Sequence, residues 1–225
     1  MIIYEDHGLK IHRLLLNDIR TNCFIVQQGR RALLIDPVDN PEKIIAYLRH
    51  NNLELEFMMS THAQFDHVFA ASGIIEHGLV ENLYLHEDDF SELRKAKSFC
   101  AVIYKKKLQV PHVKMFDDKL AEFLLFLNLG IQHVGGHTKG SCYVYDLDKK
   151  FIITGDLALN HQLRTSLFDN RENLEEIYNF LMAIRRDFKE NALIFPGHGD
   201  TSYLGIELRK NTKWHYIIQK SEASN

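Results

Sequence analysis

Four short segments carry the residue types that bind metal ions in proteins. Neutral imidazole and carboxylate groups suit zinc, iron or manganese, and the lack of thiolate among them argues against a structural zinc knuckle. The four segments are His62-Ala63-Gln64-Phe65-Asp66-His67, Gly136-His137-Thr138, Thr154-Gly155-Asp156 and Pro196-Gly197-His198-Gly199. Their side chains predict a metal centre that performs chemistry.

Each of these segments follows a run typical of a buried strand. The four runs are residues 55–60, 131–134, 151–154 and 193–195. Loops at the ends of strands are where a rigid scaffold presents reactive groups. The glycines beside His137, Asp156 and His198 allow tight turns and close backbone approach.

The remaining elements follow from hydrophobic periodicity and from turn residues. Asn40 is expected to cap a helix over residues 40–51, with Pro41 at its first position. Further helices are expected over residues 68–77, 87–97, 173–188 and 203–219. Further strands are expected over residues 9–16, 21–28, 31–35, 83–85, 123–126 and 141–146, the last forming a hairpin with 151–154. Two sheets, each covered by helices, account for this order in a single domain, residues 1–225.

Composition indicates an ordinary globular protein, with 45% hydrophobic and 25% charged residues. The net charge of −3 argues against binding of nucleic acid by phosphate neutralisation. Three cysteines without a C-x-x-C pair, no secretory signal and no apolar run of about 20 residues predict a cytoplasmic protein that is not in a membrane. We expect a small-molecule substrate, and the sequence does not indicate the oligomeric state.

The four segments together resemble the signatures of the metallo-β-lactamase superfamily. THAQFDH is similar to THxHxDH, GGHTKGS to GHTxGS, ITGD to the strand-end aspartate motif, and FPGHGDT to PGHGxxT, in the same order. TNCFIV and LLIDP are similar to strands of glyoxalase II-like members, and the resemblance extends from about Thr21 to Asn211. It implies an α+β fold, the αββα four-layer sandwich, with the metal at one edge between the sheets.

The resemblance also implies a role for each ligand. His62 and His137 belong to one metal site, while Asp66, His67 and His198 belong to a second. Asp156 is able to bridge the two sites, which hold one or two Zn²⁺ ions. Asp66 is in addition the candidate catalytic residue, because it would orient the attacking water and take up its proton.

Gln64 departs from the family pattern, which has histidine at this position. Its amide oxygen is a neutral and harder donor than imidazole. Three interpretations remain open: Gln64 ligates weakly; only the second site fills; or one metal is held by His62, His137 and Asp156. The last set resembles that of the persulfide dioxygenases of this superfamily, which bind Fe²⁺.

The sequence therefore predicts a metal-dependent hydrolase of a small thioester, similar to hydroxyacylglutathione hydrolase. We expect a short glyoxalase II-like form without the C-terminal helical domain. One alternative is a mono-iron oxidoreductase similar to persulfide dioxygenase, and another is a non-catalytic member with a degenerate metal site.

Several other polar residues are expected to have simpler roles. Thr138 and Ser141 should make local hydrogen bonds in the turn after His137, and Cys142 is expected in the core. His161 and Arg164 follow the Asp156 turn, where they face either a substrate or solvent. Three cations of the C-terminal helix either bind a substrate carboxylate or form a charged exterior face: Arg209, Lys210 and Lys213.

Overall fold

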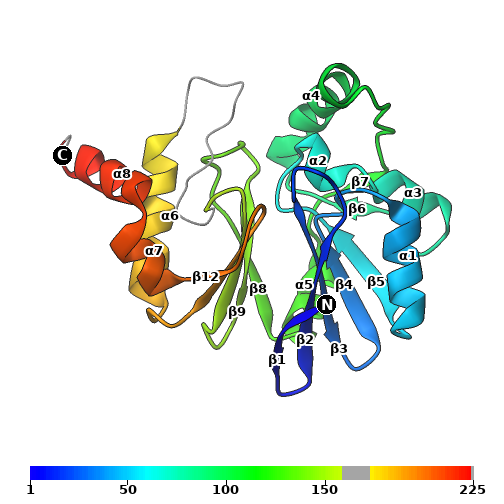
Figure 1. Ribbon diagram of the computed structural model, residues 1–225, viewed down its shortest axis with the longest axis horizontal. Helices are drawn as coiled ribbons and strands as arrows, with labels where there is room; N and C mark the ends of the chain where they lie inside the picture. The colour runs from blue at the N-terminus through cyan, green and yellow to red at the C-terminus, as the bar shows by residue number, and fades with distance from the viewer. Residues whose placement is uncertain (159–172, 224–225) are drawn as a thin grey trace. The chain divides into compact units, whose positions relative to one another are not determined.

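The computed structural model describes residues 1–158 and 173–223 of the chain. The chain forms two compact units, Met1–Leu127 and Asn128–Asn225 (Figure 1). The prediction of a single domain over residues 1–225 stays a prediction. No helix in the described parts is long and apolar enough to cross a membrane.

The first unit contains a seven-stranded sheet in sequential order. Its strands are β1 (Ile2–Asp6), β2 (Leu9–Leu15), β3 (Asn22–Gln28), β4 (Arg31–Ile35), β5 (Glu54–Met59), β6 (Leu83–Tyr84) and β7 (Val113–Lys114). Strands β1 to β4 pair antiparallel, which confirms the predicted meander and adds β1 at its edge. The pairs from β4 onward are parallel, so helices make the connections between them.

Most helices of this unit are in the chain segments that connect one parallel strand to the next. They are α1 (Pro41–His50), α2 (Phe65–Val68), α3 (Ala71–Glu76), α4 (Phe90–Phe99) and α5 (Asp118–Phe126), with a 3₁₀ turn η1 (Glu87–Asp89) and a π-helical turn η2 (Cys100–Tyr104). Helices α1 and α3 lie side by side (Figure 1). Strands β3 and β4 are buried along most of their length, so the core of the unit forms against them.

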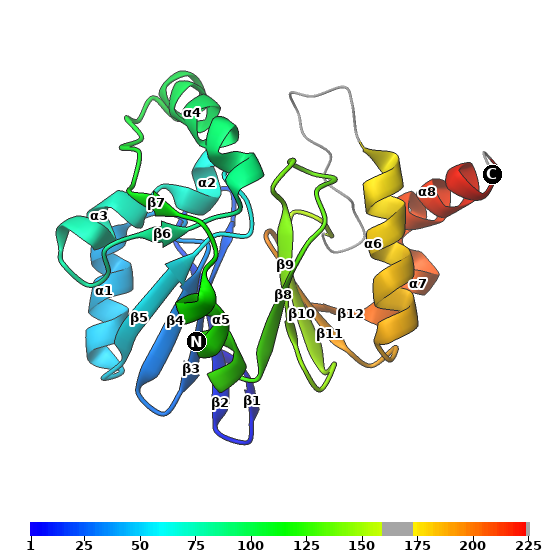
Figure 2. The ribbon, with the colours of Figure 1, turned by 180° about the vertical axis from the view of Figure 1, so that it is seen from behind.

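The second unit contains a five-stranded sheet in the order β12-β11-β10-β9-β8. Its strands are β8 (Leu129–His133), β9 (Cys142–Asp146), β10 (Phe151–Gly155), β11 (Leu193–Pro196) and β12 (Ser202–Tyr203), and its helices are α6 (Leu174–Asp187), α7 (Leu204–Lys210) and α8 (Thr212–Glu222). Strands β9 and β10 form the predicted hairpin, and β10 pairs parallel with β11. Helices α6 and α8 lie side by side (Figure 2) and share one core with the sheet.

Two predicted elements were wrong. Residues 123–126 belong to helix α5 and not to a strand, because Leu120, Phe123, Leu124 and Leu127 are buried at helical spacing. The predicted helix over residues 203–219 is two helices, since Asn211 ends α7 and its side chain accepts a hydrogen bond from the Trp214 amide at 3.2 Å.

The start of α1 also differs from expectation. The side chain of Asn40 makes no capping hydrogen bond, and its backbone is left-handed with φ 53°. Its side-chain nitrogen Nδ2 instead donates to the backbone carbonyl of Leu16 at 2.9 Å. Pro41 begins the helix as predicted, and Asn40 joins it to the loop after β2.

Candidate functional site

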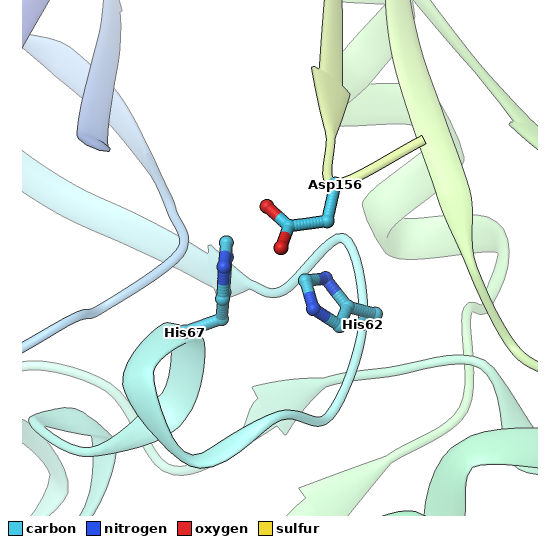
Figure 3. A group of neighbouring side chains, drawn as sticks. All are labelled: His62, His67 and Asp156. Carbon is cyan, nitrogen blue, oxygen red and sulfur yellow. The ribbon is translucent and has the colours of Figure 1, made fainter. Parts of the chain in front are cut away.

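The first group of candidate ligands lies directly after strand β5. His62 is in the loop that follows the strand, and Asp66 and His67 are in the short helix α2. Their relative exposures are 1%, 4% and 0%. The rings of His62 and His67 lie next to each other, with centroids 4.1 Å apart (Figure 3). Ionisable groups this deeply buried need polar partners or a metal.

Asp36, at the end of β4, is the main partner of this group. Its carboxylate is fully buried and accepts from the Ser60 hydroxyl at 2.9 Å and from the Thr61 amide at 2.7 Å. It also accepts from the Thr61 hydroxyl at 2.9 Å and lies 3.0 Å from Nδ1 of His67. One carboxylate thus organises the whole loop between β5 and α2.

These contacts decide which ring nitrogen of each histidine carries the proton. Nδ1 of His67 lies 3.0 Å from the Asp36 carboxylate, and the negative charge of this group favours a proton on Nδ1 over one on Nε2. The Thr61 hydroxyl donates its hydrogen bond to Asp36. The Thr61 oxygen therefore accepts a hydrogen bond from Nδ1 of His62 at 3.1 Å. In both rings the lone pair is then on Nε2, which is the form that binds metals.

A second buried carboxylate supports the same loop. Asp89, in η1, is fully buried and accepts from the backbone amide of Ala63 at 2.8 Å. His86 caps this turn by accepting from the Asp88 amide at 3.3 Å. The segment between His62 and Gln64 is therefore fixed by backbone contacts as well as by its side chains.

The second group of candidate ligands lies in the second unit. His137 follows β8, Asp156 follows β10, and His198 follows β11, with exposures of 4%, 1% and 9%. Because β10 and β11 are parallel, their carboxyl ends reach the same edge of the sheet. The Gly197 amide donates to the Gly155 carbonyl at 2.8 Å and joins the two strand ends.

The Asp156 carboxylate presents one oxygen to each histidine of its unit. Its Oδ2 lies 3.8 Å from Nε2 of His137, and its Oδ1 lies 3.5 Å from Nε2 of His198. Two atoms bound to one tetrahedral ion at about 2.0–2.2 Å are about 3.3–3.6 Å apart. The separations are close to this range and longer than hydrogen bonds, so the donor set fits a metal ion. Figure 3 shows Asp156 at the end of β10.

A glycine pair positions the loop that carries His137. Gly136 has φ +90°, and its amide donates to the Glu176 carboxylate on α6 at 2.7 Å. A Cβ at Gly136 would lie 2.8 Å from the Ile177 side chain, so only glycine fits there. After His137, the Thr138 amide donates to the Ser141 hydroxyl at 2.9 Å, which confirms the predicted local hydrogen bonding.

The other predicted residues take various positions. Gln64 is half-buried at the start of α2, where its carbonyl accepts from the His67 amide at 2.9 Å; ligation by its side chain stays a prediction. Cys142 is buried, as predicted. Arg209 is exposed and pairs with Glu190, and Lys210 is exposed as well. His161, Arg164 and the Lys213 side chain lie outside the described residues.

Sequence reasoning missed the residues that support the ligands. Asp36, Asp89 and Glu176 were not among the predicted site residues. A carboxylate on a fully buried strand end is a recognisable signal at Asp36. The other two positions lack such a signal, because their partners are backbone amides that only the fold brings to them.

Comparison with known proteins identifies the family. The sequence model of the metallo-beta-lactamase superfamily matches residues 16–198, and the chain therefore belongs to that superfamily. The α+β class and the metallo-β-lactamase fold are thus confirmed, with two mixed sheets and their helices.

Three similar proteins refine this picture. The chain is 25% identical to "Hydroxyacylglutathione hydrolase GloC" of Haemophilus influenzae, over 84% of this chain and 91% of that one. It is 27% identical to "Probable metallo-hydrolase YqgX" of Bacillus subtilis, over 90% and 96% of the two chains. The solved structure of TTHA1623 in a di-iron-bound form superposes with a TM-score of 0.77 at 26% identity, covering 90% of this chain and 99% of the other.

Proposed function

We propose that this protein is a metal-dependent hydrolase that acts on a small thioester. The proposed metal ligands are His62, Asp66, His67, His137, Asp156 and His198. Each unit contributes three of them, all buried and all on loops or first turns after strands. Membership of the superfamily supports the proposal, because the matched region includes all six residues.

The geometry of Asp156 carries this proposal. Its two oxygens face two different imidazoles at 3.5 and 3.8 Å; the first separation lies within the range for two ligands of one ion and the second is slightly longer. A purely structural carboxylate would be expected to hold its partners at normal hydrogen-bond distance. In the other unit, the Nδ1 contacts of His62 and His67 leave Nε2 of each ring as the donor to a metal.

A bound metal would lower the pKa of water and polarise a carbonyl oxygen of the substrate. The residues of the chain perform the remaining tasks. Asp66 is 4% exposed, and its carboxylate would orient the attacking water and take up its proton. A thiolate leaving group needs little protonation, which suits a ligand set with no evident general acid.

A thioester is favoured over other esters by similarity to the hydroxyacylglutathione hydrolase of Haemophilus influenzae. We propose zinc as the metal, in one or two ions. Iron is the alternative, because Gln64 leaves His62, His137 and Asp156 as two imidazoles and a carboxylate, a set that also suits a mono-iron oxidoreductase. The di-iron-bound relative supports testing both metals.

The test is to measure metal content and thioester hydrolysis on the same purified protein. Wild-type protein supplied with zinc or iron should release thiol from an acyl-glutathione, and Asp66→Asn should lower kcat/KM about 10²–10⁴-fold. Asp148→Asn changes an exposed carboxylate in a hairpin and serves as the matched control, with unchanged kinetics. Protein that binds metal and hydrolyses no thioester would refute the proposed reaction.

Gln64→His tests whether glutamine limits the number of metals. The substitution restores the imidazole of the family motif, and the expected result is a rise in the metal bound per chain by elemental analysis. An unchanged metal content would show that Gln64 does not limit occupancy.

Oxygen uptake with a persulfide by the iron form would favour the oxidoreductase instead.

A further inference from the structure

A hydrogen bond joins the loop before β3 to the candidate ligand Asp66. The hydroxyl of Thr21 lies 3.1 Å from Oδ2 of Asp66, across 45 positions of sequence. Thr21 is fully buried and Asp66 is 4% exposed, so solvent does not compete for this contact. Thr21 therefore contacts a proposed ligand directly, although it was not among the predicted site residues.

The direction of this hydrogen bond follows from the partner of Thr21 on its other side. The backbone amide of Thr21 donates to Oδ1 of Asn17 at 2.9 Å, and a backbone amide can only donate. The Asn17 side chain must then turn its Nδ2 toward the Thr21 hydroxyl, and these atoms are 3.0 Å apart. Nδ2 has only protons to offer, so the Thr21 oxygen accepts and its single proton points to Asp66.

We propose that Thr21, oriented by Asn17, is a positioning residue that holds the Asp66 carboxylate ready for metal binding; this rests on the proposed function. The torsion that turns a carboxylate about its own axis is soft. A directed hydrogen bond to one oxygen restricts that rotation and so fixes the orientation of the carboxylate plane. Groups that orient metal ligands in this way commonly change metal affinity when they are removed.

Asp36 performs the corresponding task for the neighbouring ligand. It contacts Nδ1 of His67 from the end of β4, while Thr21 contacts Asp66 from the position directly before β3. Strands β3 and β4 are paired, and both are buried. Two adjacent ligands of one short helix are thus each oriented by a different strand of the same sheet. This arrangement supports a role for Thr21 in setting the geometry of Asp66, in addition to its packing in the core.

The decisive comparison is Thr21→Val against Thr21→Ser. Valine keeps the shape of threonine and removes the hydroxyl, whereas serine keeps the hydroxyl and removes the methyl group. The affinity for Zn²⁺ would be measured by competition with a chromophoric chelator, and the ligand geometry by the visible spectrum of the Co²⁺ form. Urea unfolding of the metal-free proteins would report any structural cost separately.

We expect Thr21→Val to lower Zn²⁺ affinity about tenfold or more and to change the Co²⁺ spectrum. Thr21→Ser should keep the affinity within about threefold of wild type and preserve the spectrum. Wild-type affinity in Thr21→Val would overturn the proposal. An equal loss in both variants would also overturn it, because the methyl group and not the hydroxyl would then be responsible.

Asn17→Asp tests the direction of the hydrogen bonds from Asn17 to Thr21 and from Thr21 to Asp66. It replaces Thr21→Val if that variant does not fold. Its carboxylate still accepts from the Thr21 amide, but it presents an acceptor to the Thr21 hydroxyl and draws the proton away from Asp66. We expect weaker Zn²⁺ binding, although an added negative charge alone would strengthen it. Tighter or unchanged Zn²⁺ binding would contradict the proposed hydrogen bond from Thr21 to Asp66.

Failure of the two proposals can be told apart. Wild-type protein that binds Zn²⁺ but hydrolyses no thioester refutes only the proposed reaction, and the affinities of the variants still decide the role of Thr21. Wild-type protein that binds no metal under any supply refutes both.

Discussion

The buried histidines described in the first unit have two different environments. Those after β5 contact a buried carboxylate or a hydroxyl bound to it, and both are proposed metal ligands. His12, on β2, is 2% exposed and lies between Tyr47, at 2.9 Å from its Nδ1, and Gln27, which contacts its Nε2. Burial lowers the pKa of His12 below its usual value, and the contact with Gln27 offsets this only in part.

The lowered pKa of His12 makes stability depend on pH. The unfolded chain binds a proton on this residue more readily, so the contribution to stability is complete above about pH 6.5 and is lost as the pH falls toward the folded pKa. Urea unfolding at about pH 8 and about pH 5 should therefore show a smaller loss of stability in His12→Gln than in wild type. Equal losses in the two proteins would show that His12 titrates normally.

Among individual residues, the sequence predicted the candidate ligands but not the residues around them. Ligands stand in short motifs with characteristic neighbours, such as the glycines beside His137 and His198. Thr21 and Asp89 act on residues far away in sequence, and their types are common in loops and turns. Nothing in their local pattern distinguishes them until the chain is folded.

Among the elements, the contact between α1 and α3 depends on a glycine. Gly73 lies in α3, and a Cβ built on it would be 2.6 and 2.9 Å from two carbons of the Pro41 ring. Proline begins α1, and its ring is rigid, so it cannot yield to such a contact. The two helices can approach this closely only because position 73 has no side chain.

Gly73→Ala should therefore destabilise the protein, although alanine favours helix by about 1 kcal/mol. Forcing a methyl group into a packed contact costs about 1–3 kcal/mol, so we expect a net loss of about 1 kcal/mol in the free energy of unfolding. Denaturant unfolding would measure it, with Ser98→Ala on the exposed side of α4 as the control. A gain in stability would mean that α1 moves freely relative to α3.

Local sequence predicted elements well where alternation or capping is strong. The meander from β2 to β4 and the hairpin of β9 and β10 are of this kind. Helix α5 was predicted wrongly because a short run of Phe and Leu suits a strand as well as a buried helix. The cap from Asp117, which accepts from the Leu120 amide at 3.0 Å, was the signal that favoured the helix.

For the whole molecule, the candidate ligands are divided equally between the two compact units. A ligand that binds only the folded chain raises its stability by mass action, by about 2.7 kcal/mol when its free concentration is 100 times Kd. Zinc should therefore raise the thermal unfolding midpoint of wild type, and a chelator should reverse the effect.

His67→Ala and His198→Ala should each reduce this zinc-dependent rise, because both residues belong to the proposed ligand set. His50→Ala changes an exposed histidine at the end of α1 and should keep the full rise. Retention of the full rise in His198→Ala would argue that the first unit binds the metal alone.

The arrangement around Asp36 has a consequence for protein engineering. A designer who transplanted only the segment from Ser60 to His67 into another scaffold would carry the imidazoles across and leave behind the carboxylate that aims them. The borrowed peptide would have the composition of a metal site without its directionality. The smallest portable unit is therefore two neighbouring strand ends with the turn between them, and not the motif that a reader sees in the sequence.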